Sequence, residues 1–292
     1  TYGTGTGNVA QPIEVPKDVM AGFGGLSITI GASAMNGFQD AARYLIEYPY
    51  GCAEQVSSKA MPILVLGDIV EQYKLGGVET VALGRRHAQV AVDKLVTGQR
   101  SDGSWGTWMG SSDTPRADLT AYIMLVLKRA KEANLTVPDE TASRGSQYLQ
   151  QWLGQNLAAK ATDGHSRRWT LDVQALALFA LTDWGQRNDA AAKALYGMQT
   201  ELDLFARGML AAVFHRMSPQ SPERAALLRE ILNRVIQTAS SARFQESQSE
   251  ELQLLMHSSS RTDAILLLVL LELDPQNDLI PKLSRGLMDA RV

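Results

Sequence analysis

Apolar residues recur at helical spacing along most of the chain, from about Asn36 onwards. The first run places Phe38, Ala41 and Leu45 on one face and stops near Pro49, which is typical of an amphipathic helix. Glycine and proline signals separate the runs that follow. The pattern predicts eleven helices, with no strand among them: one that ends near Pro49, and others over 52–74, 78–97, 115–133, 139–158, 169–184, 188–199, 203–217, 220–238, 261–273 and 276–290.

The predicted helices alternate between nearly all-apolar and half-polar. Those that begin near Asp118, Asp172 and Asp263 open with small polar groups and then become strongly apolar. The helices over 139–158 and 220–238 are more polar. Two concentric layers require such an alternation, because an inner helix is buried on most of its sides. The sequence therefore predicts an all-α fold, an α/α toroid of up to six helical hairpins, whose twelfth helix we expect beyond the last residue.

The first 35 residues do not follow this pattern. Short, partly alternating β-branched runs at 12–16 and 26–30 are separated by glycines, which predicts one or two strands. Two lone strands cannot bury a face by themselves. We therefore assign 1–35 to a flanking β segment or linker and 36–292 to the helical domain.

Charge and composition exclude several classes of function. The 28 basic and 31 acidic residues nearly cancel, whereas nucleic-acid-binding proteins concentrate basic residues on one face. The longest apolar run, Ala264 to Leu271, is too short to cross a bilayer, so we expect no direct membrane contact from this segment. One cysteine and four scattered histidines lack metal-ligand spacing. The sequence therefore predicts no metal and no cofactor.

The single cysteine lies in the motif Gly51-Cys52-Ala53-Glu54-Gln55, where one predicted helix ends and the next begins. A helix N-terminus stabilises a thiolate. Gln55 is three residues further on, so its carboxamide lies one turn away on the same face. A thiol and a carboxamide placed in this way can condense to an internal thioester with loss of ammonia. The alternative interpretation is a buried cysteine beside a Glu/Gln pair that merely suits a helix start.

The longer string YPYGCAEQ at 48–55 closely resembles the thioester signature of the α2-macroglobulin and complement family, above all its bacterial macroglobulins. In that family the signature lies in an α/α-toroid thioester domain inserted into a β-sandwich of the CUB type. The resemblance implies that Cys52 and Gln55 are the bonded pair and that 1–35 belongs to a CUB-like domain. It also implies a single-use covalent trap for attacking proteases rather than an enzyme. The remaining partners implied are the other domains of a periplasmic, lipid-anchored parent protein.

A Gly- and Trp-rich loop over 102–110 is a candidate shield for this bond. Its aromatic residues can cover a thioester or simply pack at the ends of helices. The residues open to both interpretations are Tyr48, Tyr50, Trp105, Trp108 and Met109. Complement-type relatives use a histidine from this region to favour hydroxyl targets, but 99–115 contains none. We therefore expect amines to be the preferred nucleophiles.

The residues alone leave two other classes of function open. One is an enzyme on the same scaffold, either a terpenoid cyclase-like protein or a glycoside hydrolase. The chain has no Asp-rich cyclase motif, and a glycosidase needs two carboxylates that face a cavity. The other is a purely structural helical module in which Cys52 is inert.

Overall fold

A computed structural model describes residues 51–72, 78–109, 113–157, 167–245 and 258–290, together with six positions among the first 22. The strands predicted within 1–35 and the helix predicted to end near Pro49 lie outside the described residues. No described helix is both long and apolar enough to span a membrane.

The described part of the chain is mostly helical, which confirms the all-α class. Its ten α-helices follow the predicted segments closely. They are α2 (Ala53–Gln72), α3 (Val78–Thr97), α4 (Ala117–Glu132), α5 (Asp139–Asn156), α6 (Arg167–Asp183), α7 (Asp189–Tyr196), α8 (Leu204–Met217), α9 (Pro222–Leu232), α10 (Ser259–Leu273) and α11 (Leu279–Asp289).

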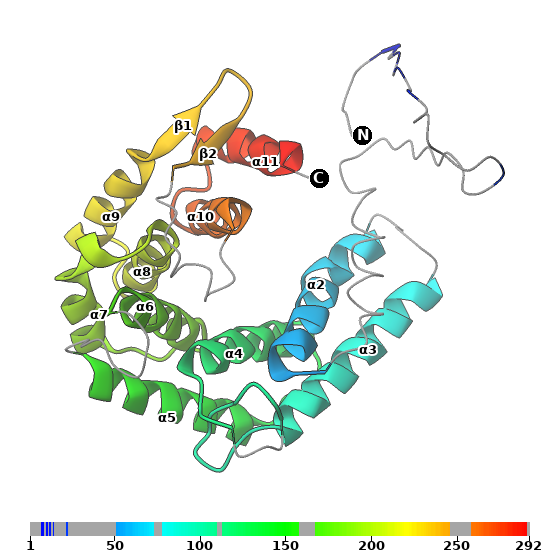
Figure 1. The fold of residues 1–292 in the computed structure, drawn as a ribbon, viewed down its shortest axis with the longest axis vertical. Coiled ribbons are helices and arrows are strands. Elements are labelled where there is room, and N and C mark those ends of the chain that lie inside the picture. The colour runs from blue at the N-terminus through cyan, green and yellow to red at the C-terminus, as the bar shows by residue number, and fades with distance from the viewer. Residues whose placement is uncertain are drawn as a thin grey trace.

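The helices form two concentric rows that curve into an open ring (Figure 1). Even-numbered helices pack against one another in the series α2, α4, α6, α8 and α10, and each odd-numbered helix packs on the even-numbered helix before it. Burial follows this order, because α6 and α8 are buried over most of their length whereas α9 buries only Leu227 and Ile231. The alternation of apolar and half-polar helices therefore corresponds to an inner and an outer row.

A chain of ion pairs shows that four inner helices run parallel. Asp183, the last residue of α6, contacts Arg129 of α4 at 2.8 Å and Arg216 of α8 at 3.7 Å. Arg216 also pairs with Glu272 of α10 at 2.7 Å. All four residues lie near the C-terminal ends of their helices. The N-terminal ends of α4, α6, α8 and α10 consequently share the opposite mouth of the ring.

Buried aspartates mark that N-terminal mouth and explain the polar residues that open the apolar runs. Asp172 Oδ1 accepts the main-chain N–H of Asp203 at 3.0 Å, and Asp263 Oδ1 accepts that of Phe244 at 2.8 Å. Each carboxylate therefore ties the start of an inner helix to the chain segment beside it. Burial, reinforced by the charge of Asp203, raises the pKa of Asp172 well above its usual range.

The helix predicted over 220–238 is wrong at its C-terminal end. The α9 helix stops at Leu232, and a hairpin follows in which β1 (Val235–Gln237) pairs antiparallel with β2 (Ala242–Phe244). Tertiary packing decides the outcome, since β2 lies against α11 so closely that a Cβ on Gly286 would be 2.2 Å from the Ala242 carbonyl oxygen. β-branched residues such as Val235 favour the strand once such a surface is available.

Candidate functional site

The Gln55 side chain reaches back to the main chain of Cys52 at the start of α2. Cys52, which directly precedes the helix, is 8% exposed, and Gln55 in the first turn is half-buried. The Cys52 N–H donates to Gln55 Oε1 at 3.2 Å, and the Val56 N–H donates to the Cys52 carbonyl at 2.9 Å. This bond is one half of a capping box, in which a side chain three residues along reaches back to the N–H before the helix. The arrangement folds the Gln55 carboxamide back onto Cys52.

The Gly- and Trp-rich loop between α3 and α4 contacts this helix start. The Thr107 carbonyl accepts the Ala53 N–H at 2.9 Å, which satisfies a donor that has no carbonyl within its own helix. Two residues earlier, the Trp105 carbonyl accepts the N–H of Arg116, the N-cap residue of α4, at 3.0 Å. One short segment of the loop therefore holds the starts of α2 and α4 together, directly beside the cysteine.

The three candidate shielding residues of the loop lie in different environments. Trp105 is fully buried, and its indole N–H donates to the Leu95 carbonyl at 2.7 Å. Met109 packs on Gly98, where a Cβ would lie 2.6 Å from the Met109 Cγ. Trp108 is 59% exposed. Their shielding roles stay predictions, as do those of Tyr48 and Tyr50, which lie outside the described residues.

A chain of polar side chains that the sequence alone did not predict extends from the motif to the next inner helix. Glu54 Oε1 accepts the Ser58 hydroxyl at 2.5 Å, and the Ser58 hydroxyl lies 3.2 Å from that of Tyr122 in α4. Burial raises the pKa of Tyr122; the Ser58 hydrogen bond opposes this shift and the Glu54 charge adds to it. Glu54 and Ser58 are four residues apart, so their spacing on one helix face indicates this contact from the sequence alone. Nothing in the local sequence points to Tyr122, which is 64 residues from Ser58.

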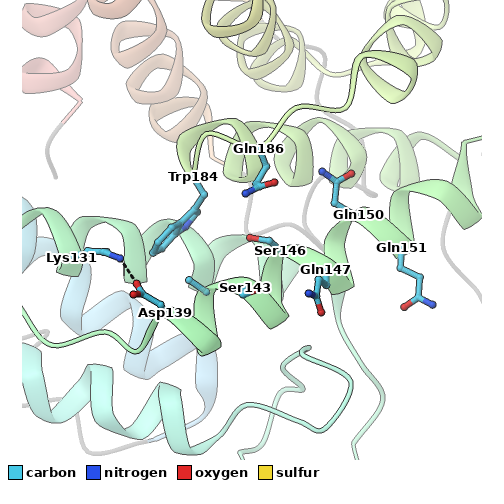
Figure 2. Close-up of a pocket in the computed structure, with 10 residues that line it drawn as sticks. Lys131, Asp139, Ser143, Ser146, Gln147, Gln150, Gln151, Trp184 and Gln186 are labelled. Atoms are coloured by element: carbon cyan, nitrogen blue, oxygen red, sulfur yellow. Dashed lines mark hydrogen bonds and ion pairs between the residues drawn. The ribbon is translucent and has the colours of Figure 1, made fainter.

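A separate cavity of about 720 Å³ lies between α5 and the C-terminal end of α6, away from the motif (Figure 2). Carboxamides, hydroxyls and an indole dominate its wall. The lining residues are Lys131, Asp139, Ala142, Ser143, Ser146, Gln147, Gln150, Gln151, Trp184 and Gln186. Asp139 is the one carboxylate among them and pairs with Lys131 at 2.5 Å. This cavity therefore lacks the pair of carboxylates that a glycoside hydrolase uses.

Comparisons with known proteins place the motif within a region that matches a known domain family. Residues 26–158 match the family model of the A-macroglobulin TED domain, and this region contains Cys52, Gln55 and the Gly- and Trp-rich loop. The α2-macroglobulin of Escherichia coli K12 is 31% identical over 157 residues, which is 50% of this chain and 9% of that protein. The α2-macroglobulin of Thermotoga maritima is 32% identical over 112 residues, covering 38% of this chain and 7% of that protein.

Solved structures share the fold at lower identity. The native conformation of E. coli α2-macroglobulin matches with a TM-score of 0.73 at 21% identity, over 86% of this chain and 15% of that one. A Salmonella α2-macroglobulin structure matches with a TM-score of 0.72, over 86% of this chain and 16% of that one. The chain thus spans less than a tenth of the length of these curated relatives. Residues 26–158 are therefore similar to the thioester-containing (TED) domain of the A-macroglobulins, and most of the chain shares its fold with bacterial α2-macroglobulins.

Proposed function

We propose that Cys52 and Gln55 form an internal thioester and that this domain is the covalent trap of a broad-range protease inhibitor. The observation that carries the proposal is the 3.2 Å contact between the Cys52 N–H and Gln55 Oε1. This contact brings the Gln55 carboxamide to the main chain of Cys52 at a helix start, within the region that matches the TED family model, and so supports a bond between the two residues. The low exposure of Cys52, 8%, supports the proposal because a hydrolysable bond must be kept from water.

The formation of the bond needs only these two side chains. The Cys52 sulfur attacks Gln55 Cδ, the Cδ–Nε2 bond breaks, and the nitrogen leaves as ammonia with the thiol proton. The Gln55 Oε1 atom remains as the thioester carbonyl oxygen. The Cys52 N–H that donates to this atom in the structure can then polarise the carbonyl toward attack.

Trapping consumes the bond once. A lysine amine of the protease attacks Gln55 Cδ, the Cδ–Sγ bond breaks, its electron pair goes to sulfur, and the amine loses a proton to water. The product is an amide at residue 55 and a free Cys52 thiolate, with no regenerating step. Among the structural relatives, the Salmonella protein is described as reacted with methylamine and an E. coli structure as activated by porcine elastase. Both descriptions support an amine-reactive bond in a protein that responds to proteases.

Amines are the proposed nucleophiles because attack by a hydroxyl needs a base. No histidine lies in the loop over 99–115. His87 is exposed on α3, and His215 accepts a hydrogen bond from Arg224 near the C-terminal end of α8. Methylamine should therefore add to the Gln55 peptide much faster than glycerol does. Equal incorporation of the two nucleophiles would mean that another group supplies the base.

Intact mass measures the proposed bond directly. Loss of ammonia predicts a mass about 17 Da below that of the sequence, together with a Cys52 that resists alkylation until methylamine is added. Cys52→Ser and Gln55→Glu are the matched controls, since each removes one reacting group and should restore the sequence mass. A sequence-exact mass with immediate alkylation of the native chain contradicts the proposal and favours the structural module.

The family resemblance also supports a location for the parent protein. We include in the proposal a periplasmic inhibitor anchored to a membrane by lipid. This part is tested separately by comparing protease digestion of the native protein in intact cells and in cells whose outer membrane has been permeabilised. A periplasmic protein should resist the protease in intact cells and be digested after permeabilisation.

A further inference from the structure

The cavity between α5 and the C-terminal end of α6 has the size of a ligand site. Asp139, Ser146 and Gln150 line it from one face of α5, as their spacings of seven and four residues require. Trp184 and Gln186 line it from the end of α6 and the residues that follow (Figure 2). The volume of about 720 Å³ falls within the range of small-molecule sites, about 300–1,000 Å³.

The Ser146 hydroxyl is a buried polar group that the chain itself does not satisfy. Ser146 is 8% exposed and lines the cavity. Two other helical serines, Ser57 and Ser284, donate to the carbonyl four residues earlier, at 2.7 and 2.9 Å. Ser146 has no hydrogen-bond partner within the described residues, and Figure 2 shows its oxygen directed toward the Gln186 carboxamide across the cavity. Most buried polar side-chain atoms are hydrogen-bonded, so this hydroxyl points to a ligand.

Carboxamides supply most of the other polar atoms of the wall. The Gln186 carboxamide is exposed and also has no partner among the described residues. Gln150 Oε1 accepts a hydrogen bond from Asn188 Nδ2 at 2.7 Å, which fixes this carboxamide in the wall. A carboxamide accepts through its oxygen and donates through its nitrogen, and a hydroxyl does both through one atom. The wall therefore suits a ligand whose own groups donate and accept at once.

The rest of the wall offers one aromatic ring and no net charge. Lys131 and Asp139 are its two charged residues, and they pair with each other at 2.5 Å. The Trp184 indole is fixed, because its N–H donates to the Met124 carbonyl at 2.9 Å and the ammonium groups of Lys128 and Lys131 lie 5.7 and 5.8 Å from its ring centroid. The ring carbons are the largest apolar surface of the wall.

We propose that this cavity binds a neutral oligosaccharide. Sugar hydroxyls donate and accept at once, which the Ser146 hydroxyl and the carboxamides require, and the apolar C–H face of a sugar ring needs only one indole. An ionic ligand is disfavoured because the two charges of the wall cancel. A peptide of ordinary composition is disfavoured because its side chains need several apolar subsites. The inference goes beyond the proposed thioester and does not depend on it.

The experiment titrates the 292-residue chain with maltotriose, cellotriose and chitotriose, followed by saturation-transfer difference NMR and calorimetry. At least one trisaccharide should bind. Ser146→Ala and Gln186→Ala should each weaken that binding about fivefold, because each removes one hydrogen bond to the sugar. The Ser146 hydroxyl has no partner in the chain, so Ser146→Ala should not lower the urea midpoint of unfolding. Loss of binding is thereby distinguished from damage to the fold.

Gln155→Ala is the matched control for Gln186→Ala, because Gln155 is an exposed carboxamide on α5 outside the cavity wall. It should bind the sugar as the wild type does, and so should Cys52→Ser. The inference is overturned if none of the three trisaccharides binds, or if neither cavity variant weakens the binding. A capped tetraserine peptide that binds as tightly as the best sugar would identify a peptide site and also overturn it. The proposed function fails by a different result, the absence of the mass loss.

Discussion

Replacing Trp105 by phenylalanine tests how the Gly- and Trp-rich loop is anchored. Leu95 lies in the last turn of α3, where its carbonyl has no helical donor because the Gln99 N–H bonds to Val96 instead, at 3.3 Å. The Trp105 indole N–H supplies the missing donor at 2.7 Å, inside a fully buried environment. The loop and the end of α3 are therefore joined through one side chain.

The expected cost of Trp105→Phe has two parts. The Leu95 carbonyl loses its partner in the core, which costs about 1–3 kcal/mol. The smaller ring leaves a void beside Gly145, whose own Cβ position is 3.3 Å from the Trp105 ring, and this adds about 1 kcal/mol. We therefore expect the free energy of unfolding to fall by about 2–4 kcal/mol.

Urea unfolding followed by far-ultraviolet circular dichroism measures this change without depending on the altered fluorescence. The matched control is Trp108→Phe, the same substitution three residues away, at a side chain that is 59% exposed. That change should stay within about 0.5 kcal/mol of the wild type. If the two variants unfold at the same urea concentration, the indole bond does not anchor the loop and the reasoning is wrong.

Two further predictions concern the same framework. Gly103→Ala should destabilise by about 2 kcal/mol or more, because Gly103 has a φ of +86° and a Cβ there would lie 2.3 Å from the Arg144 carbonyl oxygen. Gly154 lies in α5, where an added Cβ would meet no atom within 4 Å, so Gly154→Ala should raise the free energy of unfolding by about 0.5–1 kcal/mol in the same urea titration. Equal changes in stability for the two glycine variants would contradict this reasoning. Because the pKa of Asp172 is raised, the native state keeps a proton on this carboxyl that the unfolded chain releases above about pH 4. The free energy of unfolding therefore falls as the pH rises from about 4 toward the pKa of Asp172 in the native state. Asp172→Asn keeps an acceptor for the Asp203 N–H and should be more stable than the wild type at about pH 8, with the advantage shrinking toward about pH 4; a pH-independent difference refutes this.

The helical part of the fold was largely predictable because its signals are local. Helical spacing and Gly or Pro boundaries gave segments close to α2 through α11, and the polar openings near Asp118, Asp172 and Asp263 marked the starts of three inner helices. The hairpin after α9 was missed because its strands depend on packing against α11, a contact between segments distant in sequence. Periodicity does not contain that information.

The candidate site divides in the same way. The placement of Cys52 and Gln55 follows from their spacing of three residues at a helix start, so the motif alone predicted it. The positions of Tyr122 and Arg116 depend on how α4 packs beside α2 and on the loop bonds at Trp105. Residues of that kind become visible only when the chain is folded, since no local pattern connects them to the motif.

The central claim is that residues 52 and 55 form one reactive bond, and peptide mapping after treatment with isotopically labelled methylamine tests it most directly. The account predicts one label per chain, located at Gln55, and the release of one Cys52 thiol for each label incorporated. Cys52→Ser should abolish the labelling while leaving the helical content unchanged. Label spread over other residues, or a Cys52 thiol that is free before the amine is added, would contradict the claim.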